Sequence, residues 1–266
     1  MHIFIKKNIH LIRGIMLKIG DYVTRKKYGN DILFKIDKIE NNTIYLKGVD
    51  VRLYADSEKE DLILSSISKK KENFETIRQL NIKDFFYIPG TILHLDSDQE
   101  YIDKCNEYYK SQKIKAYSYK FAEKDFKNNV NNLLKKHNPN ILVITGHDAY
   151  YKKRKNNENY KNSKYFIETV KEARKIKNEN ELLIVAGACQ SDFISLIKSG
   201  ATYASSPSHV NIHALDPAII ASGLALTDKN EQINLEEIIN KTKYKSDGIG
   251  GIKSKGMMVT AYPRKE

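Results

Sequence analysis

The sequence predicts an α/β fold, in which a mainly parallel sheet flanked by helices follows a small β domain. From residue 85 on, short apolar runs alternate with amphipathic helical segments, which is the pattern of strands joined by crossover helices. Residues 17–55 instead alternate apolar and polar positions in short runs separated by Gly and Asn turn signals. The chain is therefore expected to contain two different structural units.

The expected boundaries follow from these changes in pattern. Residues 1–15 are expected to be a disordered extension, because basic residues interrupt any apolar signal-peptide core. Residues 16–56 predict a small barrel of five strands, of the SH3-like type. Residues 57–80 are charge-rich with apolar residues at mixed spacing, which favours a helical linker. Residues 81–266 then form the α/β domain.

The elements of the α/β domain are expected in a regular order. Strands are predicted at residues 91–95, 114–119, 141–144, 182–186 and 201–204. Helices are predicted after a Ser97–Glu100 capping box and over residues 126–137, 163–175, 191–199 and 217–226. The Gly-rich residues 248–262 lack the ending of a phosphate-binding loop and predict turns or a hairpin. In the first helix, Cys105 lies on the apolar face, which predicts a core residue.

The composition restricts the class of protein. No stretch approaches the roughly 18 uncharged apolar residues of a membrane span. Cys105 and Cys189 are too few for a disulfide framework and lack metal-ligand spacing, so we expect a reducing cytoplasm and neither metal nor cofactor. The net charge is +12, but the basic residues are scattered along the chain. A solvated basic surface is therefore favoured over a nucleic-acid interface.

Two buried strands end at residues with catalytic potential. Residues 141–144 lead into His147, and residues 182–186 lead into Cys189. Because parallel strands end at one edge of a sheet, these two side chains are expected to lie close together. Cys189 also precedes a predicted helix, whose N-terminal amides favour a thiolate and can hold the oxyanion of an acyl-transfer intermediate. The competing interpretation of Cys189 is a small buried hydrophobic residue.

The two motifs resemble those of a known clan. Residues 141–147, Ile-Leu-Val-Ile-Thr-Gly-His, and residues 183–189, Leu-Ile-Val-Ala-Gly-Ala-Cys, are similar to the signatures of caspase-clan cysteine peptidases. This resemblance implies a caspase-like fold and a Cys189–His147 dyad. In that clan a Gly follows the His, whereas here Gly146 precedes it and Asp148 follows it. The candidates for oxyanion stabilisation are the backbones of Gly146, Asp148 and Gln190.

The wider pattern resembles the YabG family of sporulation proteases. The similar segments are residues 18–25, 46–53, the two motifs above and 206–217. The resemblance implies an endopeptidase that processes spore-coat and cortex-associated proteins and cuts after basic residues. It further implies action in the cytoplasm of the sporulating cell or at the spore coat.

A preference for basic residues would require a carboxylate in the pocket that binds the substrate side chain. Asp96, at the end of the first strand of the α/β domain, is the favoured candidate. Asp148 is the second candidate, and it could instead orient His147. Asp98 is explained by its place at the start of a helix.

Other functions remain open on the sequence alone. A thiol hydrolase or amidotransferase could use Cys189 with His209 or His213, because in such enzymes the base follows the nucleophile. Loop capping or packing is the competing interpretation of both histidines. A basic spore protein with a structural or nucleic-acid-binding role is the alternative outside the enzymes. The oligomeric state does not follow from the sequence.

Overall fold

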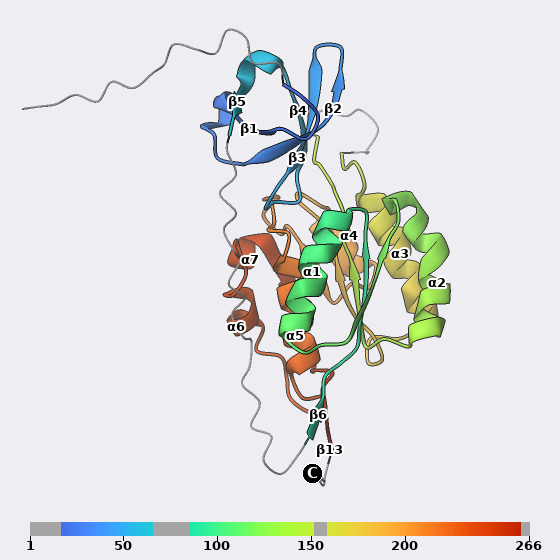
Figure 1. Ribbon diagram of the computed structural model, residues 1–266. Helices are drawn as coiled ribbons and strands as arrows, with labels where there is room; N and C mark the ends of the chain where they lie inside the picture. Colours follow the sequence, from blue (N-terminus) through green and yellow to red (C-terminus); the bar gives the residue numbers. More distant parts are fainter. Residues whose placement is uncertain (1–16, 66–85, 152–158, 262–266) are drawn as a thin grey trace, which may run out of the picture. The chain divides into compact units, whose positions relative to one another are not determined.

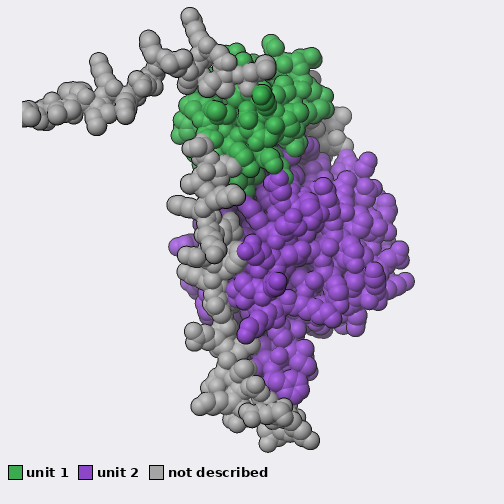
Figure 2. Space-filling model, viewed as in Figure 1, with its two compact units in different colours: residues 1–49, 55–69 green, residues 50–54, 70–266 purple. Residues whose placement is uncertain are grey.

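The computed structural model describes residues 17–65, 86–151 and 159–261. The chain divides into two compact units, which Figure 2 colours separately. Unit 1 comprises residues 1–49 and 55–69, and unit 2 comprises residues 50–54 and 70–266. Residues 50–54 thus leave the first unit within the sequence and belong to the second. The expected disordered extension at residues 1–15 lies outside the described residues.

Unit 1 contains a five-stranded antiparallel sheet (Figure 1). Its strands are β1 (Tyr22–Arg25), β2 (Phe34–Glu40), β3 (Thr43–Gly48), β4 (Tyr54–Ser57) and β5 (Leu62–Leu64), in the order β4-β3-β2-β1-β5. Two 3₁₀ turns, Lys26–Tyr28 and Lys59–Asp61, separate some of them. In β3 the buried side chains alternate with partly exposed ones, as the apolar pattern of the sequence predicts. An antiparallel sheet is confirmed, whereas closure into an SH3-like barrel stays a prediction.

The expected helical linker is wrong for its described part. β5 pairs antiparallel with β1, with Leu64 opposite Val23 and Leu62 opposite Arg25. Leu62 is buried, so this short apolar run completes the sheet. The charge-rich composition of this segment favoured a helix. Three consecutive apolar residues are, however, enough to form a short strand at the edge of the sheet. Residues 66–80 lie outside the described residues.

Unit 2 is built on a six-stranded mixed sheet. The strands are β7 (Ile92–Asp96), β8 (Ala116–Lys120), β9 (Ile141–Ile144), β10 (Leu183–Ala186), β11 (Tyr203–Ser205) and β12 (Ile249–Gly251). Their order is β12-β11-β10-β9-β7-β8, with only β12 antiparallel to its neighbour. A separate ribbon pairs β6 (Phe86–Ile88) with β13 (Val259–Ala261). The parallel α/β sheet expected from the sequence is confirmed.

Helices cover both faces of this sheet (Figure 1). They are α1 (Gln99–Ser111), α2 (Phe126–His137), α3 (Ser163–Ile176), α4 (Phe193–Lys198), α5 (Asp216–Leu226), α6 (Leu235–Ile239) and α7 (Lys245–Gly248), with a 3₁₀ turn at Glu123–Asp125. One core lies between the sheet and α1, α5 and α6, and it includes Cys105, as predicted. The other lies between the sheet and α2, α3 and α4. β9 and β10 supply both cores because successive side chains of a strand point to opposite faces. No helix in the described ranges is long and apolar enough to cross a membrane.

Two local expectations are corrected. The sequence predicts turns or a hairpin over residues 248–262, but their described part contains two strands that do not pair with each other, because β12 extends the main sheet and β13 pairs with β6. The N-cap of α1 is Asp98, whose side chain accepts from the Glu100 amide, so Ser97 is not the cap. Ser97 instead donates to Glu123. Asp and Ser are both good N-cap residues, so the sequence pattern alone could not decide between Ser97 and Asp98.

Candidate active site

Neighbouring strands carry His147 and Cys189 to the same edge of the sheet. Ile144 of β9 pairs with Ala186 of β10 in parallel register. His147 and Cys189 are each the third residue after this pair, so they leave the sheet at matching positions. The turn after β10 requires glycine, because Gly187 has φ +106° and an added Cβ would lie 2.9 Å from Leu196.

The strand order reverses between β7 and β9, which are adjacent although β8 intervenes in the sequence. In open α/β sheets, ligands bind outside the carboxyl ends of the strands at such a reversal. Asp98 follows β7 at this point, and His147 follows β9. The edge that carries His147 is therefore the one where the fold itself favours a binding site.

The imidazole of His147 is held on several sides. Its Nε2 lies 3.2 Å from Oδ2 of Asp98. The Tyr54 ring meets it edge-on with centroids 5.0 Å apart, and the Tyr101 ring lies 5.6 Å away. The backbone amide of His147 donates to Oε1 of Glu123 at 3.0 Å. His147 is only 8% exposed, so both its ring and its backbone are fixed.

This arrangement defines the tautomer of His147. A carboxylate only accepts hydrogen bonds, so Nε2 carries the proton that points at Asp98. The other ring nitrogen, Nδ1, is buried and has no hydrogen-bond partner among the described residues. A neutral imidazole with one nitrogen hydrogen-bonded to a carboxylate and the other free has its lone pair available as a base.

The sulfur of Cys189 is fully buried next to the segment that precedes α5. The Ile212 amide donates to Sγ at 3.3 Å, and the Ile212 carbonyl lies 3.7 Å from it. Burial raises the pKa of the Cys189 thiol to about 12, although the Ile212 amide opposes the shift. The expectation of a thiolate stabilised by a helix N-terminus is therefore wrong for this structure. α4 begins only at Phe193, and its own cap is Asp192.

Tyr101 is a common neighbour of the candidate residues. Its phenol donates to the Val51 carbonyl at 2.9 Å. Burial raises the pKa of Tyr101, the Arg52 guanidinium opposes the shift, and the Asp98 carboxylate adds to it. Tyr101 thus lies close to Asp98 and His147 from a single position on α1.

Arg52 and Asp96 form a fully buried ion pair beneath this edge. Arg52 also donates to the Ala214 carbonyl through Nε and Nη2, at 3.2 and 2.8 Å. Burial would raise the pKa of Asp96, but the Arg52 guanidinium outweighs it and holds that pKa well below its usual range. Thr145 donates to the same carboxylate at 2.7 Å. The Asp96 carboxylate is saturated within the chain, which favours a structural role over the expected substrate-binding one.

Asp148 is likewise engaged by its own chain. It accepts hydrogen bonds from the Ala149 and Asn162 amides and from the Ser163 and Ser191 hydroxyls. Burial raises the pKa of Asp148, and these donors oppose the shift. Because Ser191 is two residues after Cys189, Asp148 ties the loop after β9 to the loop after β10. The contacts favour this bracing role over a substrate pocket or a partnership with the His147 ring.

The other predicted backbone groups have distinct environments. The Gln190 amide donates to the Val210 carbonyl at 3.1 Å, so it is not free to hold an oxyanion. Gly146 has room for no side chain, since an added Cβ would lie 2.9 Å from both Glu123 Oε1 and Ser97 Oγ. The Cys189 amide has no acceptor among the described residues. It is the better candidate for an oxyanion donor.

The two alternative histidines lie in less suitable places. His209 is exposed and stacks on the Tyr150 and Tyr160 rings, with centroids 5.1 and 6.1 Å away. Nδ1 of His213 accepts from the Leu215 amide at 3.3 Å. Burial, assisted by the charge of Lys243, lowers the pKa of His213 to about 4. These contacts agree with capping and packing.

Several residues of the site escaped the sequence analysis. Asp98 was assigned only to helix capping, and Arg52, Tyr54 and Glu123 were not considered. Arg52 carried a signal that could have been used, because Val-Arg-Leu places one charge between apolar neighbours at residues 51–53. Within the described ranges no cluster of three or more His, Cys, Asp or Glu could hold a metal ion.

A histidine with one nitrogen on a carboxylate, at the same carboxyl edge of a parallel sheet as a buried cysteine, defines an α/β protein with an enzyme-like site. Residues 18–84 and 66–263 match the family described as YabG peptidase U57. The chain is also 40% identical over 288 residues to the sporulation-specific protease YabG of Bacillus subtilis strain 168, covering 94% of this chain and 99% of that protein. The chain belongs to the YabG peptidase family, which supports a peptidase role in sporulation.

Proposed function

We propose that this chain is a cysteine endopeptidase in which Cys189 is the nucleophile, His147 is the general base and Asp98 positions His147. The observation that carries the proposal is the His147 ring, whose Nε2 faces Asp98 while Nδ1 is free among the described residues. The strand order, with its reversal between β7 and β9, supports the caspase-like fold that the sequence motifs imply.

The reaction follows from the protonation states of the resting site. Cys189 is a neutral thiol at pH 7 because its pKa is raised. His147 Nδ1 takes the thiol proton as Sγ attacks the substrate carbonyl, and the Cys189 amide holds the oxyanion. The imidazolium then passes the proton to the leaving amine, and water hydrolyses the thioester. Asp98 stabilises the imidazolium throughout.

Substrate access requires a local rearrangement. Cys189 is fully buried and Ile212 contacts its sulfur through both amide and carbonyl. A scissile carbonyl cannot reach Sγ until the segment around Ile212 moves. The resting state is therefore protected against both substrate and alkylating reagents, and substrate binding supplies the energy for opening.

The proposed substrates are spore-coat and cortex-associated proteins, cut after basic residues in the cytoplasm of the sporulating cell or at the spore coat. This part rests on the family resemblance. Of the nearby carboxylates, Glu123 is best placed to recognise a basic side chain. It is half-buried, adjoins His147, and forms no ion pair with another described residue. The carboxylates of Asp96 and Asp148 already accept hydrogen bonds from donors within the chain, so they are less available to a substrate side chain.

The testing experiment compares Cys189→Ala, His147→Ala, His213→Ala and Cys105→Ala on a mixed peptide library with cut sites mapped by mass spectrometry. The first two variants lose cleavage, and the last two retain it. Circular dichroism confirms that each variant is folded. Retained turnover in His147→Ala together with loss in His213→Ala would contradict the proposal.

A further inference from the structure

A polar cavity of about 720 Å³ lies at the opposite end of the sheet from Cys189. Its lining includes Asn140 and Leu183, at the amino-terminal ends of β9 and β10, and Thr202, just before β11. His147 and Cys189 follow the other ends of these strands. At about 3.3 Å per strand residue, Asn140 and His147 are roughly 20 Å apart, so the cavity is separate from the candidate active site.

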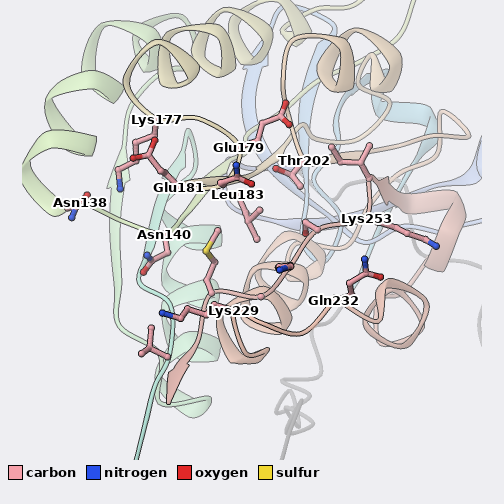
Figure 3. Close-up of a pocket in the computed structure, with 17 residues that line it drawn as sticks. Asn138, Asn140, Lys177, Glu179, Glu181, Leu183, Thr202, Lys229, Gln232 and Lys253 are labelled. Carbon is pink, nitrogen blue, oxygen red and sulfur yellow. The ribbon is translucent and has the colours of Figure 1, made fainter. Parts of the chain in front are cut away.

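The lining of the cavity includes three lysines of the carboxyl-terminal region, namely Lys229, Lys253 and Lys255. All three are exposed, and none forms an ion pair with a carboxylate among the described residues. Figure 3 shows Lys229 and Lys253 at different parts of the cavity, with their side chains extending in opposite directions. Lys229 has Asp228 as an acidic neighbour, whereas no acidic partner is found for Lys253 or Lys255 among the described residues, so these lysines create a local positive potential that attracts carboxylates or other anions.

Other lining residues are acidic or already hydrogen-bonded. Lys177 donates to the Pro139 carbonyl at 2.7 Å, so it is less available to a ligand than the three lysines above. Glu179 and Glu181 lie on the same side (Figure 3). Their negative charges repel any anionic group on that side of the cavity, so the carboxylates of a ligand would have to lie at Lys229, Lys253 and Lys255. No arginine lines the cavity, although arginine is the residue best suited to bidentate phosphate recognition.

The remaining lining suits a polypeptide. The exposed amides of Asn138 and Gln232 offer both donors and acceptors, as an extended backbone requires. Leu183, Ile252 and Met257 add apolar surface to the lining. A volume of about 720 Å³ accommodates several side chains of an extended segment rather than a single small ion.

We propose that this cavity binds an acidic polypeptide segment, with its carboxylates on Lys229, Lys253 and Lys255 and its backbone on the neighbouring amides. The cavity is a binding site distinct from the proposed catalytic centre, and it does not depend on the catalytic assignment. In a peptidase, such a site would hold a region of the protein substrate remote from the cleaved bond, and so would favour substrates that carry an acidic stretch.

The test uses the full-length chain with Cys189→Ala, so that no peptide is cleaved. Fluorescence anisotropy measures binding of a labelled Glu-rich peptide and of matched Gln-rich and Lys-rich peptides at low and high salt. Variant K253Q/K255Q removes two charges from the cavity. The matched control K110Q/K171Q removes two exposed charges from α1 and α3.

We expect the Glu-rich peptide to bind in a salt-sensitive manner and K253Q/K255Q to weaken it about tenfold, since each exposed ion pair contributes modestly. The control variant should bind within about twofold of the parent, because its lysines lie outside the cavity. Equal weakening in both variants would show a general charge effect and overturn the proposal. Tripolyphosphate is tested in parallel, and tight tripolyphosphate binding without Glu-peptide binding would overturn it in favour of a small-anion site.

Discussion

Oδ2 of Asp98 lies 3.2 Å from Nε2 of His147, while Oδ1 of the same carboxylate accepts from the Glu100 amide at the start of α1. The Asp98 side chain, in the connection between β7 and α1, therefore both caps the helix and sets the orientation of the proposed base. Because the helix fixes the carboxylate and the carboxylate fixes the ring, the imidazole is oriented before any substrate arrives.

The first prediction concerns Asp98→Asn. Asparagine still caps α1, but its single oxygen faces the Glu100 amide, so the NH₂ group faces His147. This forces the ring proton from Nε2 to Nδ1 and removes the lone pair that takes the thiol proton. We expect kcat to fall by about 100-fold or more, with the melting temperature almost unchanged.

The matched control is Asp103→Asn, which makes the same change on α1 at a position paired with Gln99. It should keep wild-type kcat. A merely structural Asp98 would predict unchanged kcat in Asp98→Asn, because the cap survives. Steady-state kinetics on one cleaved peptide, with the pH profile recorded for each variant, distinguish the two roles.

The second prediction concerns the reactivity of Cys189 in the resting protein. With a pKa of about 12 against an ordinary value of 9.0, the thiolate fraction below pH 9 is about a thousandfold smaller than for a free cysteine. Iodoacetamide should therefore label Cys189 very slowly at pH 8, and the rate should rise with pH. Peptide mass spectrometry measures the rate. Complete labelling within minutes at pH 7 would show a stabilised thiolate instead.

The third prediction concerns the buried Arg52–Asp96 pair. Arg52→Met leaves the Asp96 carboxylate buried without its cation, and we expect a loss of about 3–5 kcal/mol in the free energy of unfolding. The double variant Arg52→Met/Asp96→Leu should recover much of this loss, because no charge remains buried. Urea unfolding of the wild type, Arg52→Met, Asp96→Leu and the double variant measures it, and a loss in the double variant equal to the sum of the two single losses would contradict the coupling.

The same pair has a defined pH signature. The pKa of Asp96 is lower in the folded chain than its ordinary value of 3.8, so folding favours the ionised form. This stability is present above pH 3.8 and is lost as the pH falls from there toward the folded pKa. Between about pH 4 and pH 2, the wild type should therefore lose more stability than the double variant.

The fourth prediction concerns Glu123, which accepts from the His147 amide and lies against Gly146. Glu123→Gln keeps an acceptor but removes the charge, so KM for substrates with a basic residue should rise while kcat stays close to wild type. Gly146→Ala places a methyl group where the Glu123 oxygen lies and should lower kcat as well. Unchanged KM for an Arg peptide in Glu123→Gln would exclude Glu123 from substrate recognition.

The parallel sheet was predictable because its strands are continuous apolar runs with helices between them, as at residues 141–144 and 183–186. The edge positions of His147 and Cys189 followed from the same regularity. β5 was missed because three residues carry too little periodicity to separate a strand from a helix. β12 was missed because its Gly-rich sequence lacks the signal of a sheet strand.

The polar partners of the site depended on long-range contacts that no local pattern encodes. Asp98 and His147 lie on different loops, and Arg52 meets Asp96 only after residues 50–54 have joined unit 2. The expected helix-dipole effect on Cys189 failed for a related reason. α4 begins later than predicted, and burial by Ile212 dominates the thiol.

The assignment of residues 50–54 to unit 2 affects how the chain can be divided or recombined. The cation that neutralises Asp96 is encoded upstream of β4 and β5, inside the stretch that makes the antiparallel sheet. A shortened gene that starts after residue 65 would encode every strand of the parallel sheet and still lack Arg52. Exchange of the amino-terminal region between relatives would succeed only where the incoming segment brings an arginine at the same place. Any division of the chain therefore has to keep residues 50–54 with unit 2.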